Sequence, residues 1–121
     1  MVDPTPAFSS QRDQDTLIVL PLGHSLQFAT GAVESQTGKL IEILDEPEIQ
    51  HVVVDLQKVS MLDSIVIGAI IAFANRARKQ GGQACLCHVS KRMQETLDYV
   101  RIDQMMTQHE TREDAMASIR G

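Results

Sequence analysis

Short apolar runs along the chain predict a sheet whose inner strands are covered on both faces. Residues 16–20 form a near-continuous apolar run, and residues 51–56 are short and β-branched, which is the clearest strand pattern in the sequence. Residues 84–89 predict a third inner strand. Weaker patterns at residues 7–11 and 105–108 predict edge strands, so we expect a sheet of four to five strands.

Longer periodic segments between these strands predict about four helices. Residues 29–45, 64–80 and 90–101 have helical periodicity, and a short final helix is expected from residue 111 onward. Because the strands alternate with helices through short connections, the class is α/β with a mostly parallel sheet.

The 121 residues suit one domain. We expect an N-terminal arm and edge strand at residues 1–15, followed by the domain proper over residues 16–119.

The helix predicted at residues 64–80 is apolar on two faces. One broad face carries Val66, Ile67, Ile70, Phe73, Ala74 and Ala77. The opposite side carries Ile65, Ala69 and Ala72, and Arg76 continues their line. A helix of this kind either lies between two layers or offers one face to a partner. Since a fully enclosed helix is hard to arrange in so short a chain, we expect the second face to dock a partner. The alternative is that these residues are ordinary surface.

Asp63 and Ser64 lie where this helix is expected to begin. Ser64 has the residue type and place of an N-cap, with its hydroxyl at the positive end of the helix dipole. Asp63 would then be a charge just outside the helix. A cap hydroxyl at an exposed helix start is also within reach of a kinase, so the two roles are compatible.

Charge and hydropathy exclude several kinds of partner. The formal net charge is −5 and most basic residues are scattered, which argues against nucleic acid as a partner. The one basic cluster, residues 76–79, suits a helix C-terminus. No segment approaches the roughly 20 apolar residues of a membrane span, and the first residues do not resemble a signal peptide. We therefore expect a cytoplasmic protein without membrane contact.

Catalytic, metal and cofactor patterns are weak. Cys85 and Cys87 lie two apart in a predicted strand and are interpreted as reduced core thiols. Strand alternation should direct His88 away from both thiols, and no second cysteine pair completes a zinc site, so no metal is expected. Ser64 has no histidine at a characteristic spacing and no Gly-x-Ser-x-Gly around it. We expect neither an enzyme nor a cofactor, and no bound metal.

Several segments together resemble the STAS domain of bacterial anti-sigma factor antagonists. The resemblance is carried by residues 52–56, 59–64, 67–82, 85–90, 99–102 and 111–119. Its most specific part is Asp63-Ser64 between a strand and an apolar helix. The resemblance implies the STAS fold, a mostly parallel mixed sheet with about four helices.

The resemblance also implies a switch. In such proteins the serine after the aspartate, here Ser64, is phosphorylated by an anti-sigma factor that is a serine kinase of the histidine-kinase-like ATPase type. The unphosphorylated form binds this partner and so regulates sigma-dependent transcription, and a PP2C-type phosphatase restores it. The chain has no Gly-rich phosphate loop of its own, so ATP would come from the partner.

The residues expected to bind the partner surround Ser64. They are Met61, Leu62, Asp63, Ile65, Val66, Ala69, Ala72 and Arg76, with His24 and Ser25 from the loop after the second strand. Two departures from the family pattern stand out. Residues 65–68 read Ile-Val-Ile-Gly where the family has Ser/Thr-Gly-Leu-Gly, and residues 23–27 lack the usual acidic residue.

Two other functions fit the same resemblance. The Asp-Ser-apolar form also resembles the small STAS subunits of stressosome complexes, which would make the chain a scaffold that assembles with itself or with other STAS chains through Ile65, Ala69 and Ala72. A third alternative is a STAS domain that binds a small ligand and serves lipid transport.

Overall fold

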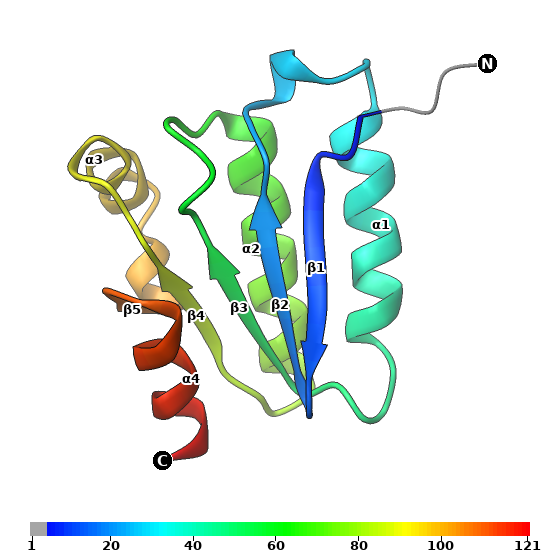
Figure 1. The fold of residues 1–121 in the computed structure, drawn as a ribbon, viewed down its shortest axis with the longest axis vertical. Helices are drawn as coiled ribbons and strands as arrows, with labels where there is room; N and C mark the ends of the chain where they lie inside the picture. Colours follow the sequence, from blue (N-terminus) through cyan, green and yellow to red (C-terminus); the bar gives the residue numbers. More distant parts are fainter. Residues whose placement is uncertain (1–4) are drawn as a thin grey trace.

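The computed structural model describes residues 5–121, which form one five-stranded mixed sheet (Figure 1). The strands are β1 (Phe8–Asp13), β2 (Thr16–Pro21), β3 (His51–Asp55), β4 (Ala84–Cys87) and β5 (Thr107–His109), and they lie side by side in sequence order. β1 pairs with β2 in the antiparallel direction, and every other neighbouring pair is parallel. The α/β class and the mostly parallel sheet predicted from the sequence are therefore confirmed.

Four α-helices in the described residues cover the two faces of the sheet unequally. They are α1 (Ala32–Leu44), α2 (Ser64–Lys79), α3 (Lys91–Tyr99) and α4 (Arg112–Arg120). The buried residues of α1, α2 and α3 share the larger core with one face of the sheet, whereas Ala115 of α4 packs on the other face. In Figure 1, α2 lies behind the strands and α4 in front of them.

β2 shows why the inner strands are apolar throughout. Leu17 and Val19 point into the larger core, and Ile18 between them points into the smaller core beneath α4. Alternate residues of a strand face opposite sides of the sheet, so a strand covered on both sides needs apolar residues at every position. The prediction that this strand is buried on both faces is confirmed.

The ends of some elements differ from the predicted ones. β1 runs on to Asp13, because a two-residue turn with Gln14 at φ 57° replaces the longer turn expected. A 3₁₀ turn at Ser25–Gln27 and the left-handed Gly31 delay the start of α1. A second 3₁₀ turn at Ile102–Gln104 shifts the last strand to Thr107–His109. Short polar segments can adopt such turns without changing the hydrophobic pattern, so the pattern does not reveal them.

Candidate functional site

The start of α2 lies at the end of the sheet where the parallel strands finish, beside the loop that follows β2 (Figure 1). The N-cap of α2 is Asp63, not Ser64: Asp63 has extended backbone angles, and its Oδ1 accepts a hydrogen bond of 3.0 Å from the amide of Val66. Ser64 is the first residue of the helix and is exposed. The prediction that Ser64 caps the helix is therefore wrong, because its neighbour already accepts the free amide.

Asp63 also holds the loop after β2 in place. Its Oδ2 accepts hydrogen bonds from both the amide and the hydroxyl of Ser25, each 2.7 Å long. Partial burial by itself would raise the pKa of Asp63, but the hydrogen bonds from Val66 and Ser25 outweigh burial and hold that pKa below its usual value. A single ionised carboxylate thus joins the β2–α1 loop to the first turn of α2.

This carboxylate makes the stability of the protein depend on acid pH. Because the pKa of Asp63 is lowered in the folded state, its stabilising effect is complete above the unfolded value near 3.8 and is lost as the pH falls through the folded value. An Asp63→Asn variant would keep a cap acceptor but no charge. We expect the difference in unfolding free energy between wild type and this variant to shrink in urea titrations below about pH 4. A difference unchanged down to the lowest measurable pH would contradict this role of the charge.

Apolar side chains are exposed around Ser64. Leu26 from the loop after β2 is 89% exposed, Ile65 at the start of α2 is 42% exposed, and Met61 lies three residues before Ser64. Ile65 lines two neighbouring shallow hollows, of about 310 and 340 Å³. One hollow includes Leu26 and the other includes Ser64. We call the exposed side chains of Leu26, Met61, Ser64 and Ile65 the Ile65 surface.

Three of the residues predicted to bind a partner are not available at the surface. Leu62, Val66 and Ala69 are buried. Ala72 is partly buried, and Arg76 forms an ion pair with Asp45, with Nη1 2.7 and 2.9 Å from its two carboxylate oxygens. The reason is that α1 packs beside α2 and covers part of it beyond its first turn. The prediction that Ala69 lies on a face open to a partner is wrong. Leu62 and Val66 are buried in the core, as expected of Val66 on the sheet-facing side of α2, and neither is exposed, as the predicted partner contacts require.

Of the two loop residues predicted to lie near Ser64, His24 and Ser25, only Ser25 has a hydrogen bond to the start of α2. Ser25 reaches Asp63 directly. His24 is partly buried, and its amide donates to Oε1 of Gln27 within the same loop. No acidic residue is present in this loop, so the contact between the loop and the start of α2 depends on Ser25 instead.

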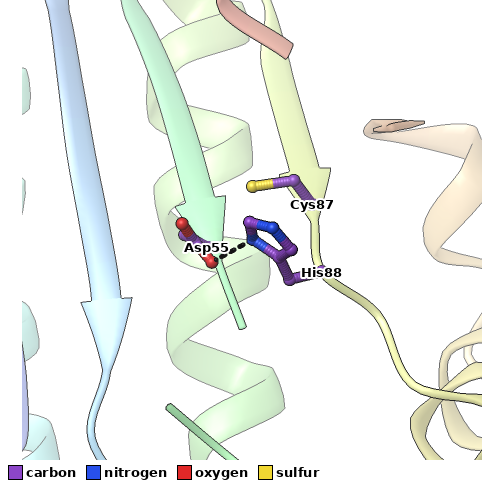
Figure 2. Close-up of side chains that lie close together, drawn as sticks. All are labelled: Asp55, Cys87 and His88. Carbon is purple, nitrogen blue, oxygen red and sulfur yellow. Dashed lines mark hydrogen bonds and ion pairs between the residues drawn. The ribbon is translucent and has the colours of Figure 1, made fainter. Parts of the chain in front are cut away.

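A second group of polar side chains, which the sequence analysis missed, lies at the ends of β3 and β4. Asp55 is fully buried, and its carboxylate accepts hydrogen bonds from Nε of Arg112 (3.0 Å) and from the amide and side chain of Gln57 (3.0 and 2.8 Å). Nδ1 of His88 lies 2.8 Å from Oδ1 of the same carboxylate (Figure 2). The group ties β3, β4 and α4 together.

The expected direction of the His88 side chain is wrong. β4 ends at Cys87, and His88 has a left-handed backbone with φ 57°, which interrupts the alternation of side chains. Figure 2 shows the ring of His88 turned toward Asp55, close to Cys87. Cys85 and Cys87 are buried and free, as predicted. Burial and the nearby charge of Asp55 raise the pKa of Cys87 to about 12, so this thiol is protonated at neutral pH.

The hydrogen-bond donors around Asp55 keep its carboxyl group ionised despite its burial. Burial would raise the pKa of this carboxyl, but the hydrogen bonds from His88, Gln57 and Arg112 outweigh it and lower the pKa below its usual value. Asp55 is therefore ionised at neutral pH, and its charge is balanced by a partly exposed arginine.

The sequence profile of the STAS domain matches residues 10–115, which is most of the chain. The protein therefore belongs to the STAS domain family, as its residues predicted. Members of this type, including the anti-sigma factor antagonists, are binding modules and not enzymes, so the chain is classed as non-enzymatic. A comparison with curated protein sequences finds no significant match.

Solved structures share the whole fold at low sequence identity. A putative anti-sigma factor antagonist from Thermotoga maritima superposes with a TM-score of 0.79 at 17% identity, over 94% of this chain and 95% of that one. The Bacillus anti-sigma factor antagonist SpoIIAA in its unphosphorylated form gives 0.74 at 18%, over 95% and 99%. A variant of RsbS from Moorella thermoacetica gives 0.78 at 15%, over 93% and 94%. At these identities the likeness establishes the STAS fold.

None of the helices within residues 5–121 is long and apolar enough to cross a membrane.

Proposed function

We propose that the chain is an anti-sigma factor antagonist that binds a serine kinase of the histidine-kinase-like ATPase type through the Ile65 surface and is released when Ser64 is phosphorylated. The observation that carries the proposal is the placing of Ser64. Its side chain is exposed beside Ile65, and its hydroxyl has no hydrogen bond to any residue in the described part of the chain. A free hydroxyl within an exposed apolar surface can reach the active site of a kinase. It can also lie inside a docking interface.

The charges around Ser64 explain how a phosphoryl group would end docking. The group adds about −1.5 to −2 charge. Asp63 is ionised next to it, and Glu34 lines both hollows beside Ile65. Burying a phosphoryl group among these carboxylates adds repulsion and a large desolvation penalty. The attraction of the α2 N-terminus holds the group at this place but supplies no contact to a partner.

The fold relatives support this function without establishing it. SpoIIAA, whose fold this chain shares, is known in unphosphorylated and phosphorylated forms. The proposal also includes a PP2C-type phosphatase that restores the binding form, and a cytoplasmic location, where such kinases and phosphatases have their ATP and substrates.

The test is phosphorylation by the cognate kinase. The protein is incubated with ATP and each kinase of the histidine-kinase-like ATPase type encoded near its gene, and its intact mass is measured. We expect one added phosphate in the wild type and none in Ser64→Ala. Ser60→Ala is the matched control, since Ser60 is also exposed and lies four residues earlier, and it should be phosphorylated like the wild type. A phosphate that persists in Ser64→Ala, or no phosphate with any neighbouring kinase, refutes the switch.

A second candidate is a STAS scaffold of the stressosome type. It is favoured by Ile65, an exposed apolar residue where the family pattern has a polar one, and by the fold shared with RsbS. Such a scaffold would associate through the Ile65 surface with a second copy or with another STAS chain. Light scattering at rising protein concentration should then show growing particles, and a monomer at every concentration would count against self-assembly.

A further inference from the structure

Three side chains of the kinds that bind metal converge where β3 and β4 end. One ligand atom each from Asp55, Cys87 and His88 lies within 4.8 Å of the other two. Figure 2 shows the carboxylate, the thiol and the imidazole ring directed toward a common region. We propose that Asp55, Cys87 and His88 form a binding site for a zinc ion, separate from the surface around Ser64.

The backbone is arranged to bring the three ligands together. Asp55 and Cys87 are paired residues in the parallel register of β3 and β4, so their side chains start close to each other. His88 would point away in a regular strand, but its left-handed conformation turns the ring back. The amide of His88 donates to the carbonyl of Glu110, which fixes this turn against the segment before α4.

Gln57 and Arg112 donate hydrogen bonds to the Asp55 carboxylate, as residues that surround and orient a metal ligand do. Gln57 and Arg112 donate to Oδ2, and the amide of Gln57 donates to Oδ1, so the carboxylate has one fixed orientation. Outer partners of this kind orient the ligands of metal sites. Arg112 donates to Oδ2 and leaves Oδ1 turned toward His88.

Zinc is the metal that suits this ligand set. It accepts thiolate, imidazole and carboxylate together, and sites with three protein ligands leave a fourth position open. On binding, the S–H bond of Cys87 would break, its proton would pass to solvent and a Zn–S bond would form. Nδ1 of His88 would give up the proton that it shares with Asp55, and solvent would return a proton to Nε2, so that the imidazole binds as a neutral ligand. The zinc ion would then have two anionic ligands, Asp55 and Cys87, and one neutral ligand, His88. The His88 side chain is 34% exposed, so an ion can enter from that side and the fourth position can take water or a group from a partner.

Cobalt(II) provides a test because its complexes with thiolate absorb near-ultraviolet and visible light, where zinc complexes do not. The full-length reduced protein is titrated with Co²⁺ and then with Zn²⁺. We expect a thiolate-to-cobalt absorption band that saturates at one equivalent and disappears when Zn²⁺ displaces the cobalt. Competition with a coloured chelator then gives the zinc affinity.

Three variants separate this site from the other thiol and from the other histidines. Cys87→Ser should lose the band and weaken zinc binding by more than the about 10–100-fold that changes in outer partners cause. Cys85→Ser should keep both, since Cys85 is an equally buried thiol on the same face of β4, near Thr107 and Ser118 instead. His88→Gln should also weaken binding, and circular dichroism confirms that each variant is folded.

Two results would overturn the proposal. A wild type without the thiolate band, or with zinc affinity equal to that of folded Cys87→Ser and His88→Gln, would show that the three side chains serve only the hydrogen-bond network around Asp55.

Discussion

Replacing Asp55 with alanine is expected to lower the free energy of unfolding by about 3–5 kcal/mol, the cost of breaking a buried ion pair by removing one partner. The carboxylate is fully buried and accepts hydrogen bonds from Arg112 and Gln57, with His88 beside it. Without it, these donors lose their common acceptor and a cavity remains between β3 and β4. Since domains are stable by only about 5–15 kcal/mol, the loss is a large share of the total.

Urea denaturation followed by circular dichroism, with a chelator present to remove any metal effect, measures this change. Asp103→Ala is the control, because Asp103 is exposed in the turn before β5, and it should alter stability by no more than about 0.5 kcal/mol. A loss for Asp55→Ala no larger than for this control would show that the network contributes little.

Replacing Ile65 with glutamate is expected to weaken binding to the proposed anti-sigma kinase by at least about 30-fold, the effect of removing one central contact residue. Ile65 is the large apolar residue that lines both hollows beside Ser64. The variant removes its apolar contact and adds a charge beside Asp63 and Glu34. It thus imitates part of the effect of a phosphoryl group without modifying Ser64.

Calorimetry or surface plasmon resonance with the purified kinase gives the affinity. Tyr99→Glu is the matched control: Tyr99 is as exposed as Leu26, at 89%, but it ends α3 and lies outside the Ile65 surface. Equal weakening by both variants would show that net charge, and not the Ile65 surface, controls binding. An unchanged affinity for Ile65→Glu would place the interface elsewhere.

The inner strands and the long helices could be predicted because each has a clear pattern of apolar residues, whereas the edge strands β1 and β5 have few apolar residues and their ends were misplaced. The apolar run of β2 and the β-branched run of β3 admit few other structures. The exposure of individual residues along α2 was harder to predict, because it depends on where α1 packs. Ala69 and Ile65 are both apolar and share one side of α2, yet Ala69 is buried and Ile65 is 42% exposed.

The polar contacts of the two sites could not be predicted from residue types. Aspartate and serine are about equally good N-caps, so the choice between Asp63 and Ser64 is decided by hydrogen bonds from Ser25, 38 residues away. Asp55 meets Arg112 across 57 residues, and His88 reaches it only through an unusual backbone angle. A carboxylate that ends a buried strand was the one local signal, because a buried charge needs a basic partner from elsewhere in the chain.

The division of roles between Asp63 and Ser64 has a consequence for reversibility. Asp63 anchors the first turn of α2, whereas Ser64 is the residue proposed to carry the phosphoryl group. Adding or removing a group on Ser64 therefore leaves the anchor of the helix in place, and both forms can keep the same architecture. Ser64 could therefore be phosphorylated and dephosphorylated many times without the protein having to refold.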